Sequence, residues 1–314
     1  MAPKVSVIVV SYNTRELTRE CLEAVFADGY RGELEVFVVD NASRDGSAAM
    51  VAERFAEVRL IENDDNVGFA RANNQALAVA TGEQLFLLNS DAMVRPGCIE
   101  ALVGCLEREP EVGLVGPALF NVDGTRQPSW GDFPTPLQEA LFQSYLFKAV
   151  PVAFPLGREV HPLLRGRYAR AHRVDWLTGA ALMLRSEVYT RVGGLPQHSF
   201  MYGEDLELCA LAAEAGFMSH YEPRAEAVHL LGASSRKDHA RWIDHYTEAN
   251  LGYYARFAPA AKRRAAVAVL VGSAYRNAIW SGLGLVSEKR RVEVAGRRRG
   301  YARAIGHAWR ALRG

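Results

Sequence analysis

Four short polar segments in the N-terminal part of the chain each follow an apolar run and are rich in hydrogen-bond acceptors. They are Ser11-Tyr12-Asn13, Asp40-Asn41-Ala42-Ser43, Asn63-Asp64-Asp65-Asn66 and Asn89-Ser90-Asp91. Carboxylate and amide oxygens accept hydrogen bonds from ligand N–H groups, and they are the ligands that hard divalent cations prefer. Such a set could therefore bind a nucleotide together with a metal ion.

Two of these acids have a structural explanation as well as a functional one. Asp40 precedes Ser43, Asp45, Gly46 and Ser47, which can turn the chain and cap the next helix. Asn89-Ser90-Asp91 alone is equally typical of a capped turn. The functional alternatives are that Asp40 accepts a hydrogen bond from a base edge and that Asp91 binds Mg²⁺ or Mn²⁺. Position favours the metal for Asp91, because this residue follows an expected central strand beside the strand that ends in Asp40.

The segment from Asn66 to Gln75 opens a predicted helix and includes Arg71. A helix N-terminus and a guanidinium group both attract negative charge, so this segment is a candidate diphosphate site. Ordinary helix capping explains Asn66 but not the cluster. Asn73 and Asn74 have poor helix propensity, which predicts a compensating polar contact.

Two further candidate groups lie beyond residue 200. Glu204 and Asp205 stand at the start of a helix predicted over 205–215, where acids complement the helix dipole. The alternative is that one of them is a general base that takes a proton from a hydroxyl. His229 ends a strand-like run that starts at Pro223, and a lone histidine of this kind is more often structural than a ligand.

Alternating strands and helices must position these residues. Strands are predicted over Val5–Val10, Glu35–Val39, Val58–Ile61, Gln84–Leu88 and Val112–Val115, and helices start near Thr14, Ser43 or Asp45, Asn66 and Pro96. This alternation predicts an α/β fold with a mostly parallel central sheet and helices on both faces, in which ligands bind at the carboxyl ends of the strands. Residues 121–172, which are rich in proline and aromatic residues, predict a long excursion instead of another strand and helix.

Several classes of protein are disfavoured. The first strand is followed by Ser-Tyr-Asn-Thr-Arg-Glu-Leu, which lacks the glycines of a dinucleotide-binding loop, and no GxxxxGK[ST] phosphate loop is present. Cys21, Cys98, Cys105 and Cys209 form no CxxC pair, so neither a disulfide scaffold nor a zinc ribbon is expected. The first apolar run is too short for a signal peptide. A reducing cytoplasm fits these features best.

The charge of the chain is divided unevenly. Residues 260–314 hold 13 Lys or Arg and two acids, which is +11, so the whole-chain charge of +1 leaves −10 on the other residues. A final amphipathic helix is predicted, with Tyr301, Ile305, Trp309 and Leu312 on one face and Arg299, Arg303, Arg310 and Arg313 opposite. Such a helix suits an anionic membrane surface. The alternative is a helix packed on the body or on another subunit of a homo-oligomer.

Two other interpretations of this tail are disfavoured. Residues 265–286 are apolar, but Arg276 and Asn277 lie at their centre, so an interfacial or core-packed segment is expected instead of a membrane span. Nucleic acid is not predicted as a partner, because the tail lacks a recognised nucleic-acid-binding fold.

Seven segments resemble motifs of the family 2 inverting glycosyltransferases of the GT-A fold, and more narrowly of the bacterial rhamnosyltransferase-like branch. In the family's order, and covering residues 5–235, they are VSVIVVSYN, VVDNASRDGS, NVGFARANN, LLNSDAMV, WLTGAALMLR, FMYGEDLELC and HLLGASS. The resemblance implies a Rossmann-like catalytic domain over 1–258, with a nucleotide-sugar half to about 120 and an acceptor half over 121–258. A basic helical tail over 259–314 follows.

The resemblance also implies a role for each candidate residue. The nucleotide sugar would be held by Ser11, Asn13, Asp40, Asn41, Asn66, Arg71, Asn89 and Ser90, with Asp40 accepting from a pyrimidine N3–H. Asp91 would be the metal-binding last residue of an Asn-x-Asp form of the family's Asp-x-Asp motif, and His229 would complete the metal or diphosphate contacts. Asp205 matches the catalytic base, with Glu204 as its neighbour. Trp176, Thr178 and Gly179 would line the acceptor side.

The activity that the resemblance implies is sugar transfer that depends on Mg²⁺ or Mn²⁺. The preferred donor is dTDP-rhamnose, and the preferred acceptor is a hydroxyl of a lipid-linked or cell-surface polysaccharide precursor at the inner face of the cytoplasmic membrane. UDP-hexose, UDP-galactofuranose and GDP-mannose remain alternative donors. A membrane scaffold that binds nucleotide sugars without turnover is the non-enzymatic alternative, and the complete Glu204-Asp205 pair argues against it.

Overall fold

The computed structural model describes residues 2–143, 160, 164–197, 203–230, 249–261, 264–265, 267–269 and 303. The chain forms two compact units. The first contains Met1–Asp132, Ala153–Phe200 and Glu204–Ser234, and the second contains Phe133–Val152, Met201–Gly203 and Ser235–Gly314. In the second unit the structure describes α5 (Pro136–Gln143) and a helix over 249–257. Every candidate site residue belongs to the first unit.

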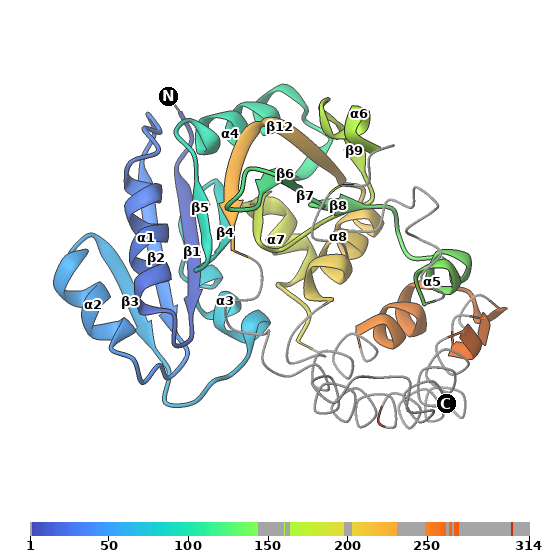
Figure 1. Ribbon diagram of the computed structural model, residues 1–314, viewed down its shortest axis with the longest axis horizontal. Helices are drawn as coiled ribbons and strands as arrows, with labels where there is room; N and C mark the ends of the chain where they lie inside the picture. Colours follow the sequence, from blue (N-terminus) through green and yellow to red (C-terminus); the bar gives the residue numbers. More distant parts are fainter. Residues whose placement is uncertain are drawn as a thin grey trace. The chain divides into compact units, whose positions relative to one another are not determined.

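A mixed sheet forms the centre of the first unit, with strands in the order β3-β2-β1-β4-β11-β6-β12-β5 (Figure 1). These strands are β1 (Val5–Ser11), β2 (Leu34–Asp40), β3 (Val58–Glu62), β4 (Gln84–Asn89), β5 (Ala92–Val94), β6 (Val112–Phe120), β11 (Ala181–Arg185) and β12 (Met218–His229). The first four strands and the β6–β12 pair are parallel, whereas β11 runs antiparallel to β4 and β6 and β5 antiparallel to β12. The predicted α/β fold with a mostly parallel sheet is confirmed.

Four short strands extend this arrangement. They are β7 (Arg126–Gln127), which pairs with β6, β9 (His172–Val174), which pairs with β12, and the separate pair of β8 (Trp130–Gly131) with β10 (Trp176–Leu177). The predicted excursion over 121–172 thus contains, where it is described, only short elements, namely β7, β8, α5, α6 (Arg165–Tyr168) and the start of β9.

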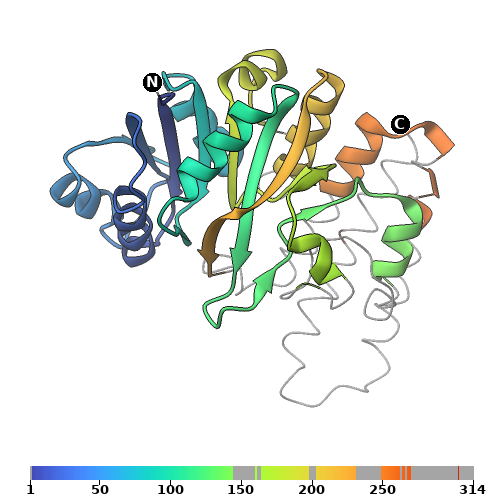
Figure 2. The ribbon, with the colours of Figure 1, turned by 90° about the horizontal axis from the view of Figure 1, so that it is seen from above.

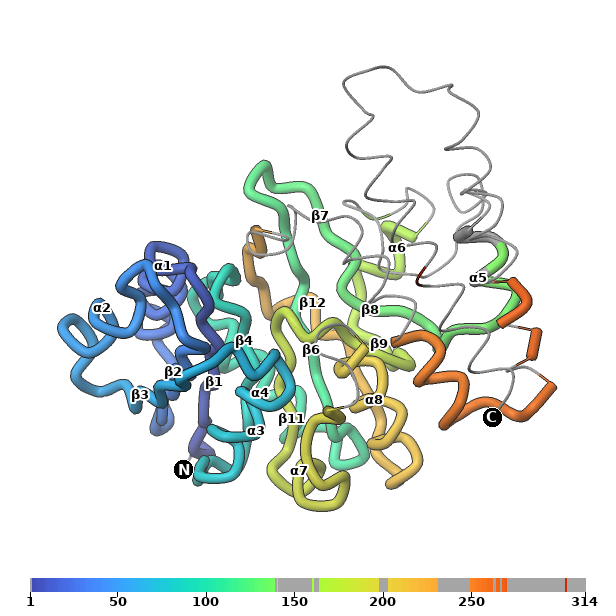
Figure 3. Tube along the Cα trace, turned by 90° about the horizontal axis from the view of Figure 1, so that it is seen from below, coloured from blue at the N-terminus to red at the C-terminus, as the bar shows by residue number. Residues whose placement is uncertain are grey.

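Helices cover both faces of the sheet. They are α1 (Arg15–Phe26), α2 (Ser47–Arg54), α3 (Phe69–Leu77), α4 (Cys98–Arg108), α7 (Ser186–Val192) and α8 (Glu204–Glu214). Val5, Val7 and Val9 of β1 pack in one apolar cluster with Leu22 of α1, and α2 and α4 contribute to the same cluster. Ile8 points to the other face and is also buried, so β1 has apolar residues on both of its faces. Figures 2 and 3 show α1 and α7 on opposite sides of the sheet.

The five predicted strands all form, and three of the predicted helices begin slightly later than expected. Thr14 is the N-cap of α1 as predicted, but Gly46, Gly68 and Gly97 occupy the N-cap positions of α2, α3 and α4 with φ of 82°, 87° and 80°. A positive φ is accessible to glycine at little cost, so the glycines, and not the polar residues before them, reverse the chain into each helix.

The predictions for the C-terminal tail fall largely outside the described residues. Almost all of the apolar segment 265–286 and of the final amphipathic helix lies there, so the domain boundary at 258 and the membrane contact stay predictions. Within the part of the chain that the structure describes, no helix combines the length and the apolar character needed to cross a membrane.

Candidate active site

The carboxyl ends of four parallel strands, β1 to β4, meet at one edge of the sheet. Ser11 at the end of β1 is in register with Asp40 of β2, and the residue before Ser11 is in register with Asn89 of β4. Because β11 runs the opposite way, its start lies at the same edge, and the Asn89 N–H donates to the Ala180 carbonyl at 2.9 Å. β3 ends at this edge too, and the Asn63 N–H donates to the Asp40 carbonyl at 2.9 Å. The edge thus brings together all four predicted polar segments and the loop that contains Gly179.

Asp40 fits both interpretations of its sequence. Its Oδ1 accepts a hydrogen bond from the Ser43 N–H at 2.8 Å, which is the turn contact that a structural role predicts. Its Oδ2 is buried and accepts no hydrogen bond from the described residues, although Asp40 is only 3% exposed. A buried carboxylate oxygen without a donor is costly, so this atom is suited to a donor from a ligand.

Ser11 and Asn13 have structural partners. Ser11 is fully buried, and its hydroxyl accepts a hydrogen bond from Thr18 of α1 at 3.1 Å. Asn13, with φ of 54°, accepts from the Arg44 N–H at 2.8 Å and donates its own N–H to the Ser43 hydroxyl at 2.9 Å. These contacts fasten the loop after β1 to the loop after β2. The predicted contacts of Ser11 and Asn13 with a nucleotide stay predictions.

An amide network holds the loop between β3 and α3. Asn41 donates to Asn66 Oδ1 at 3.3 Å, and the same oxygen accepts the Gly68 N–H at 3.0 Å. Asn63 donates to Asn41 Oδ1 at 3.0 Å and exchanges two hydrogen bonds with Gln75. Asn41 and Asn66, the predicted nucleotide contacts, thus fix the turn into α3. Asn63 belongs to the same network, although no role beyond its place in a polar segment was predicted for it.

Arg71 differs from these amides because it is exposed on α3 and makes no hydrogen bond or ion pair with the described residues. Its guanidinium is thus not neutralised by a carboxylate there. The expected compensation for the paired asparagines is present: Asn73 donates to the Phe69 carbonyl at 2.9 Å, and Asn74 makes two hydrogen bonds of 2.9 Å with the backbone of Leu195. Asn74 therefore joins α3 to the loop that follows α7.

Strand pairing brings Asp91 and His229 together from distant parts of the sequence. His229, the last residue of β12, is in register with Ala92 of β5, and the Leu230 N–H donates to the Asp91 carbonyl at 2.9 Å. His229 Nε2 lies 3.3 Å from Asp91 Oδ1, and each residue is 8% exposed. In the same turn, the Ser90 hydroxyl lies 3.1 Å from the Thr14 hydroxyl, while Asn89 is half-buried.

Gln127 contacts the other side of the His229 ring and was not predicted. Its Nε2 donates to the carbonyls of Phe120 and His229 and to Asn121 Oδ1, so this atom is the NH₂ group. The remaining atom, Oε1, lies 3.1 Å from His229 Nδ1 and must be the acceptor. Nδ1 therefore carries a proton, and Nε2 faces Asp91. Gln127 lies in a two-residue strand within an irregular segment, and no sequence signal identifies it.

The chemistry of this pair fits a divalent cation. A carboxylate oxygen and an imidazole nitrogen that face each other at 3.3 Å need either a second ring proton or a cation between them. Carboxylate and imidazole both occur as ligands of Mn²⁺, and Mg²⁺ is usually held by one or two carboxylates together with substrate phosphates. The described residues contain no group of three or more candidate metal-binding side chains. The pair therefore suits a cation whose other ligands come from a bound diphosphate and water.

Asp205 lies in the first turn of α8 with both carboxylate oxygens fixed. Oδ2 accepts the Gly179 N–H at 2.9 Å, and Oδ1 accepts the Leu206 N–H at 2.8 Å. Burial raises the pKa of Asp205, and these two hydrogen bonds oppose the rise. Burial, and then the charge of Asp205, raises the pKa of Glu204. A carboxylate with a raised pKa is a better proton acceptor, so the arrangement favours a general base.

The predicted acceptor-binding residues support this carboxylate or are largely covered. A Cβ on Gly179 would lie 3.4 Å from the Asp205 Cβ, an ordinary van der Waals contact, so the Gly179 loop packs directly against Asp205. Trp176 is 8% exposed, and its indole donates to the Asp132 carbonyl at 3.1 Å, so the ring presents little surface to a ligand. Thr178 is half-buried, and its N–H donates to the Ser129 carbonyl at 3.0 Å.

Comparisons with known proteins point to one family. The profile of the family described as "Glycosyl transferase family 2" matches residues 6–158. A relative from Mycobacterium tuberculosis, N-acetylglucosaminyl-diphospho-decaprenol L-rhamnosyltransferase, is 29% identical over 66% of this chain and 70% of its own length. The O-antigen biosynthesis protein RfbC of Myxococcus xanthus is also 29% identical, over 75% of this chain but only 18% of its own length.

A solved structure shares the fold. The mannosyltransferase PcManGT from Pyrobaculum calidifontis, in complex with GDP-Man and Mn²⁺, aligns with a TM-score of 0.57 and 22% identity, over 99% of this chain and 88% of its own. At this identity the likeness concerns the fold alone. With the family match and the relatives, it leads to one conclusion: the chain is a family 2 glycosyltransferase of the GT-A fold.

Proposed function

We propose that this enzyme transfers rhamnose from dTDP-rhamnose to a hydroxyl of a lipid-linked or cell-surface polysaccharide precursor, with inversion at the anomeric carbon. The name of the Mycobacterium tuberculosis relative supports rhamnose and a lipid-linked acceptor, and the name of the Myxococcus xanthus relative supports a role in O-antigen biosynthesis. The observation that carries the proposal is a pair of hydrogen bonds made by adjacent residues. The Gly179 N–H donates to Asp205, and the carbonyl of the neighbouring Ala180 accepts from the Asn89 N–H. This pair connects the proposed base with the turn that bears the proposed metal ligand.

The donor would bind along the carboxyl ends of β1, β2 and β4. Asp40 Oδ2 would accept the pyrimidine N3–H, which is a chemical reason for a thymine or uracil nucleotide. Arg71 and the start of α3 would bind the diphosphate. Asp91 and His229 would hold Mg²⁺ or Mn²⁺, which when bound stabilises negative charge on the departing diphosphate.

The chain's own residues would carry out the proton transfer. The acceptor oxygen attacks the anomeric carbon from the face opposite the nucleotide, while Asp205 takes the hydroxyl proton. The bond from the anomeric carbon to the diphosphate oxygen breaks, and its electron pair leaves with dTDP. The Gly179 and Leu206 N–H groups hold the Asp205 carboxylate throughout this step, so no reorientation is needed before proton transfer.

Other donors and a peripheral location belong to the same proposal. A UDP-hexose, UDP-galactofuranose or GDP-mannose would use the same edge, and the solved relative with GDP-Man is a reason to test the last. The basic residues over 260–314 would bring the enzyme to an anionic membrane at the cytoplasmic face, where a lipid-linked acceptor is found. The alternative role of this tail is to join subunits of a homo-oligomer. The alternative to enzymatic activity is a protein that binds nucleotide sugars without turnover.

A ligand screen followed by a turnover assay tests the proposal. The thermal midpoint is measured with dTDP-rhamnose, UDP-sugars and GDP-mannose, each with and without Mn²⁺, because a ligand of the folded state raises the midpoint. We expect the largest rise with dTDP-rhamnose and Mn²⁺, together with Mn²⁺-dependent release of dTDP. Stabilisation by UDP-sugars but not by dTDP-sugars would exclude rhamnose from dTDP as the donor. Binding without turnover of any donor, with a range of lipid-linked acceptors, would favour the non-enzymatic alternative.

A further inference from the structure

We infer that Gln127 is a positioning residue for the metal site: it keeps the proton of His229 on Nδ1 and so presents Nε2, with its lone pair, to the cation beside Asp91. This inference rests on the proposed metal-dependent function and assigns a role to a residue that does not itself touch the cation. It is carried by the geometry of the Gln127 amide, which contacts both the side chain and the backbone of His229.

The orientation of the Gln127 amide is determined by its surroundings. Three acceptors surround Nε2, namely the Phe120 carbonyl, Asn121 Oδ1 and the His229 carbonyl. An amide turned by 180° would place an oxygen against these three oxygens, which is unfavourable. Oε1 must therefore face His229 Nδ1, and only a protonated Nδ1 makes a hydrogen bond there.

A hairpin formed by β6 and β7 places Gln127 beside the His229 ring. Gln127 of β7 is in register with Leu119 of β6, and the turn between them is closed by the Asn121 N–H, which donates to the Thr125 carbonyl at 2.8 Å. The Asn121 side chain adds a hydrogen bond to the Thr125 hydroxyl at 2.8 Å. Figure 3 shows the path of the chain from β6 into β7. Because Gln127 is only 2% exposed, water cannot easily replace its contact with the ring.

The tautomer matters because an imidazole nitrogen binds a metal only through a free lone pair. Metal-bound histidines commonly donate their other ring N–H to an oxygen acceptor, which fixes the ring and its tautomer. Without Gln127 Oε1, the proton would be better placed on Nε2, since Asp91 Oδ1 lies 3.3 Å away and would accept it. The cation would then have to displace that proton. Loss of the Gln127 contact should weaken metal binding by roughly 10- to 100-fold.

The test compares Gln127→Met with the full-length wild-type protein. Mn²⁺ affinity is measured from the electron paramagnetic resonance signal of free Mn²⁺, with Mn²⁺ alone and with dTDP added. The protonation of the histidine nitrogens is read by NMR of ¹⁵N-histidine-labelled, metal-free protein, with His229→Gln identifying the signals of His229. We expect Nδ1 to be protonated in the wild type, the proton to move to Nε2 in Gln127→Met, and the dissociation constant for Mn²⁺ to rise roughly 10- to 100-fold.

Two controls separate positioning from a general loosening of the hairpin. Thr125→Val removes the contact between the Asn121 side chain and the Thr125 hydroxyl but leaves the Gln127 amide intact, so it should keep wild-type Mn²⁺ affinity. Gln127→Met in a His229→Gln background should cause no further loss, because a residue that acts through His229 has no effect once the ring is gone. An equal loss in Thr125→Val, or an additional loss in the double variant, would overturn the positioning role.

The remaining outcomes distinguish this inference from the proposed function. Unchanged Mn²⁺ affinity in Gln127→Met, or an unprotonated Nδ1 in the wild type, would overturn the role of Gln127 while leaving the metal site intact. If the wild type binds no Mn²⁺, either alone or with dTDP, the metal part of the proposed function fails and the role of Gln127 in presenting a ligand fails with it.

Discussion

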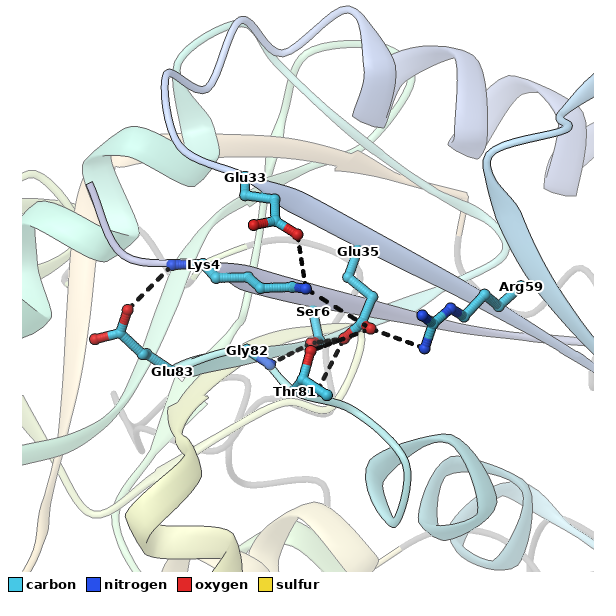
Figure 4. A network of polar contacts seen from close by, with 8 residues as sticks. All are labelled: Lys4, Ser6, Glu33, Glu35, Arg59, Thr81, Gly82 and Glu83. Atoms are coloured by element: carbon cyan, nitrogen blue, oxygen red, sulfur yellow. Dashed lines mark hydrogen bonds and ion pairs between the residues drawn. The ribbon is translucent and has the colours of Figure 1, made fainter. Parts of the chain in front are cut away.

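The two ends of β2 carry buried carboxylates in opposite situations. Glu35, near the amino end and 7% exposed, accepts hydrogen bonds from the Ser6 hydroxyl at 2.7 Å and the Thr81 N–H at 2.9 Å, and it pairs with Arg59 at 3.0 Å (Figure 4). Asp40, at the carboxyl end and 3% exposed, has one oxygen that no described residue supplies with a donor. At the amino edge of the sheet, where Glu35 lies, the chain itself supplies hydrogen-bond donors to the buried carboxylate. At the carboxyl edge, where Asp40 lies, one carboxylate oxygen can still accept a hydrogen bond from a ligand.

The pKa shifts follow the same division. Burial would raise the pKa of Glu35, but hydrogen bonds from Thr81 and Ser6 and the charge of Lys4 outweigh it, so the pKa is lowered. At the carboxyl edge, burial raises the pKa of Asp205 and of Glu204. Buried acids thus stabilise the fold where the chain supplies enough donors, and they remain available for chemistry where it does not.

The largest effect is expected at Asp91. Because Asn89 stands where a second acid would be, Asp91 supplies the carboxylate charge of the motif, and Asp91→Ala should abolish Mn²⁺-dependent transfer. Asn89→Ala is the matched variant in the same turn and should cost less. Initial rates over a range of Mn²⁺ concentrations measure both. A greater loss in Asn89→Ala than in Asp91→Ala would mean that the assignment of the two positions is reversed.

The next effect is expected from Asp205→Asn, which removes the proton acceptor but keeps the shape of the side chain. The value of kcat should fall on the order of 10²- to 10⁴-fold, the usual contribution of a general base. The thermal midpoint and the affinity for dTDP should change little, since the variant leaves the donor side intact. Transfer at the wild-type rate by a folded Asp205→Asn protein would show that Asp205 is not the base. It would also contradict the assignment of a chemical role to the acids at the carboxyl edge.

The sequence predicted the carboxyl edge better than its supporting contacts. Asp40 and Asp91 do lie at one edge, because apolar strands have a recognisable pattern and parallel strands align their carboxyl ends. The expected adjacency of their two strands is wrong, since β1 lies between β2 and β4. Gln127 was missed because its partner His229 lies 102 residues away and no periodic pattern encodes a contact between two side chains. The burial of Trp176 was missed for the same reason, since Trp176 lies in β10 and pairs with β8, and each of these strands has only two residues.

Lower pH should affect Glu35 at the amino edge and Asp205 at the carboxyl edge in opposite ways. The lowered pKa of Glu35 contributes stability that is present above the pKa of an unfolded glutamate and is lost as pH falls through the folded value. The raised pKa values of Asp205 and Glu204 have the opposite sign: they favour the folded state at low pH, and this contribution is lost as pH rises through the folded values.

As pH falls, we therefore expect transfer to be lost by protonation of Asp205 at a pH where the fold is still intact. The pH profile of kcat/KM, compared with the thermal midpoint at each pH, measures this separation. Unfolding that accompanies or precedes the loss of activity would contradict it.

The smallest effect on catalysis is expected from Glu35→Gln, which tests the amino edge. One oxygen of Glu35 becomes an NH₂ group among donors from Ser6, Thr81 and Arg59, so hydrogen bonds are lost and the free energy of unfolding should fall by about 1–3 kcal/mol. Because these contacts lie at the edge opposite the site, kcat per folded molecule should stay at the wild-type value. Urea unfolding and the turnover assay are run on the same preparation. A Glu35→Gln protein that keeps its stability but loses activity would show that the two ends of β2 are coupled, and that the division between a structural and a chemical edge is wrong.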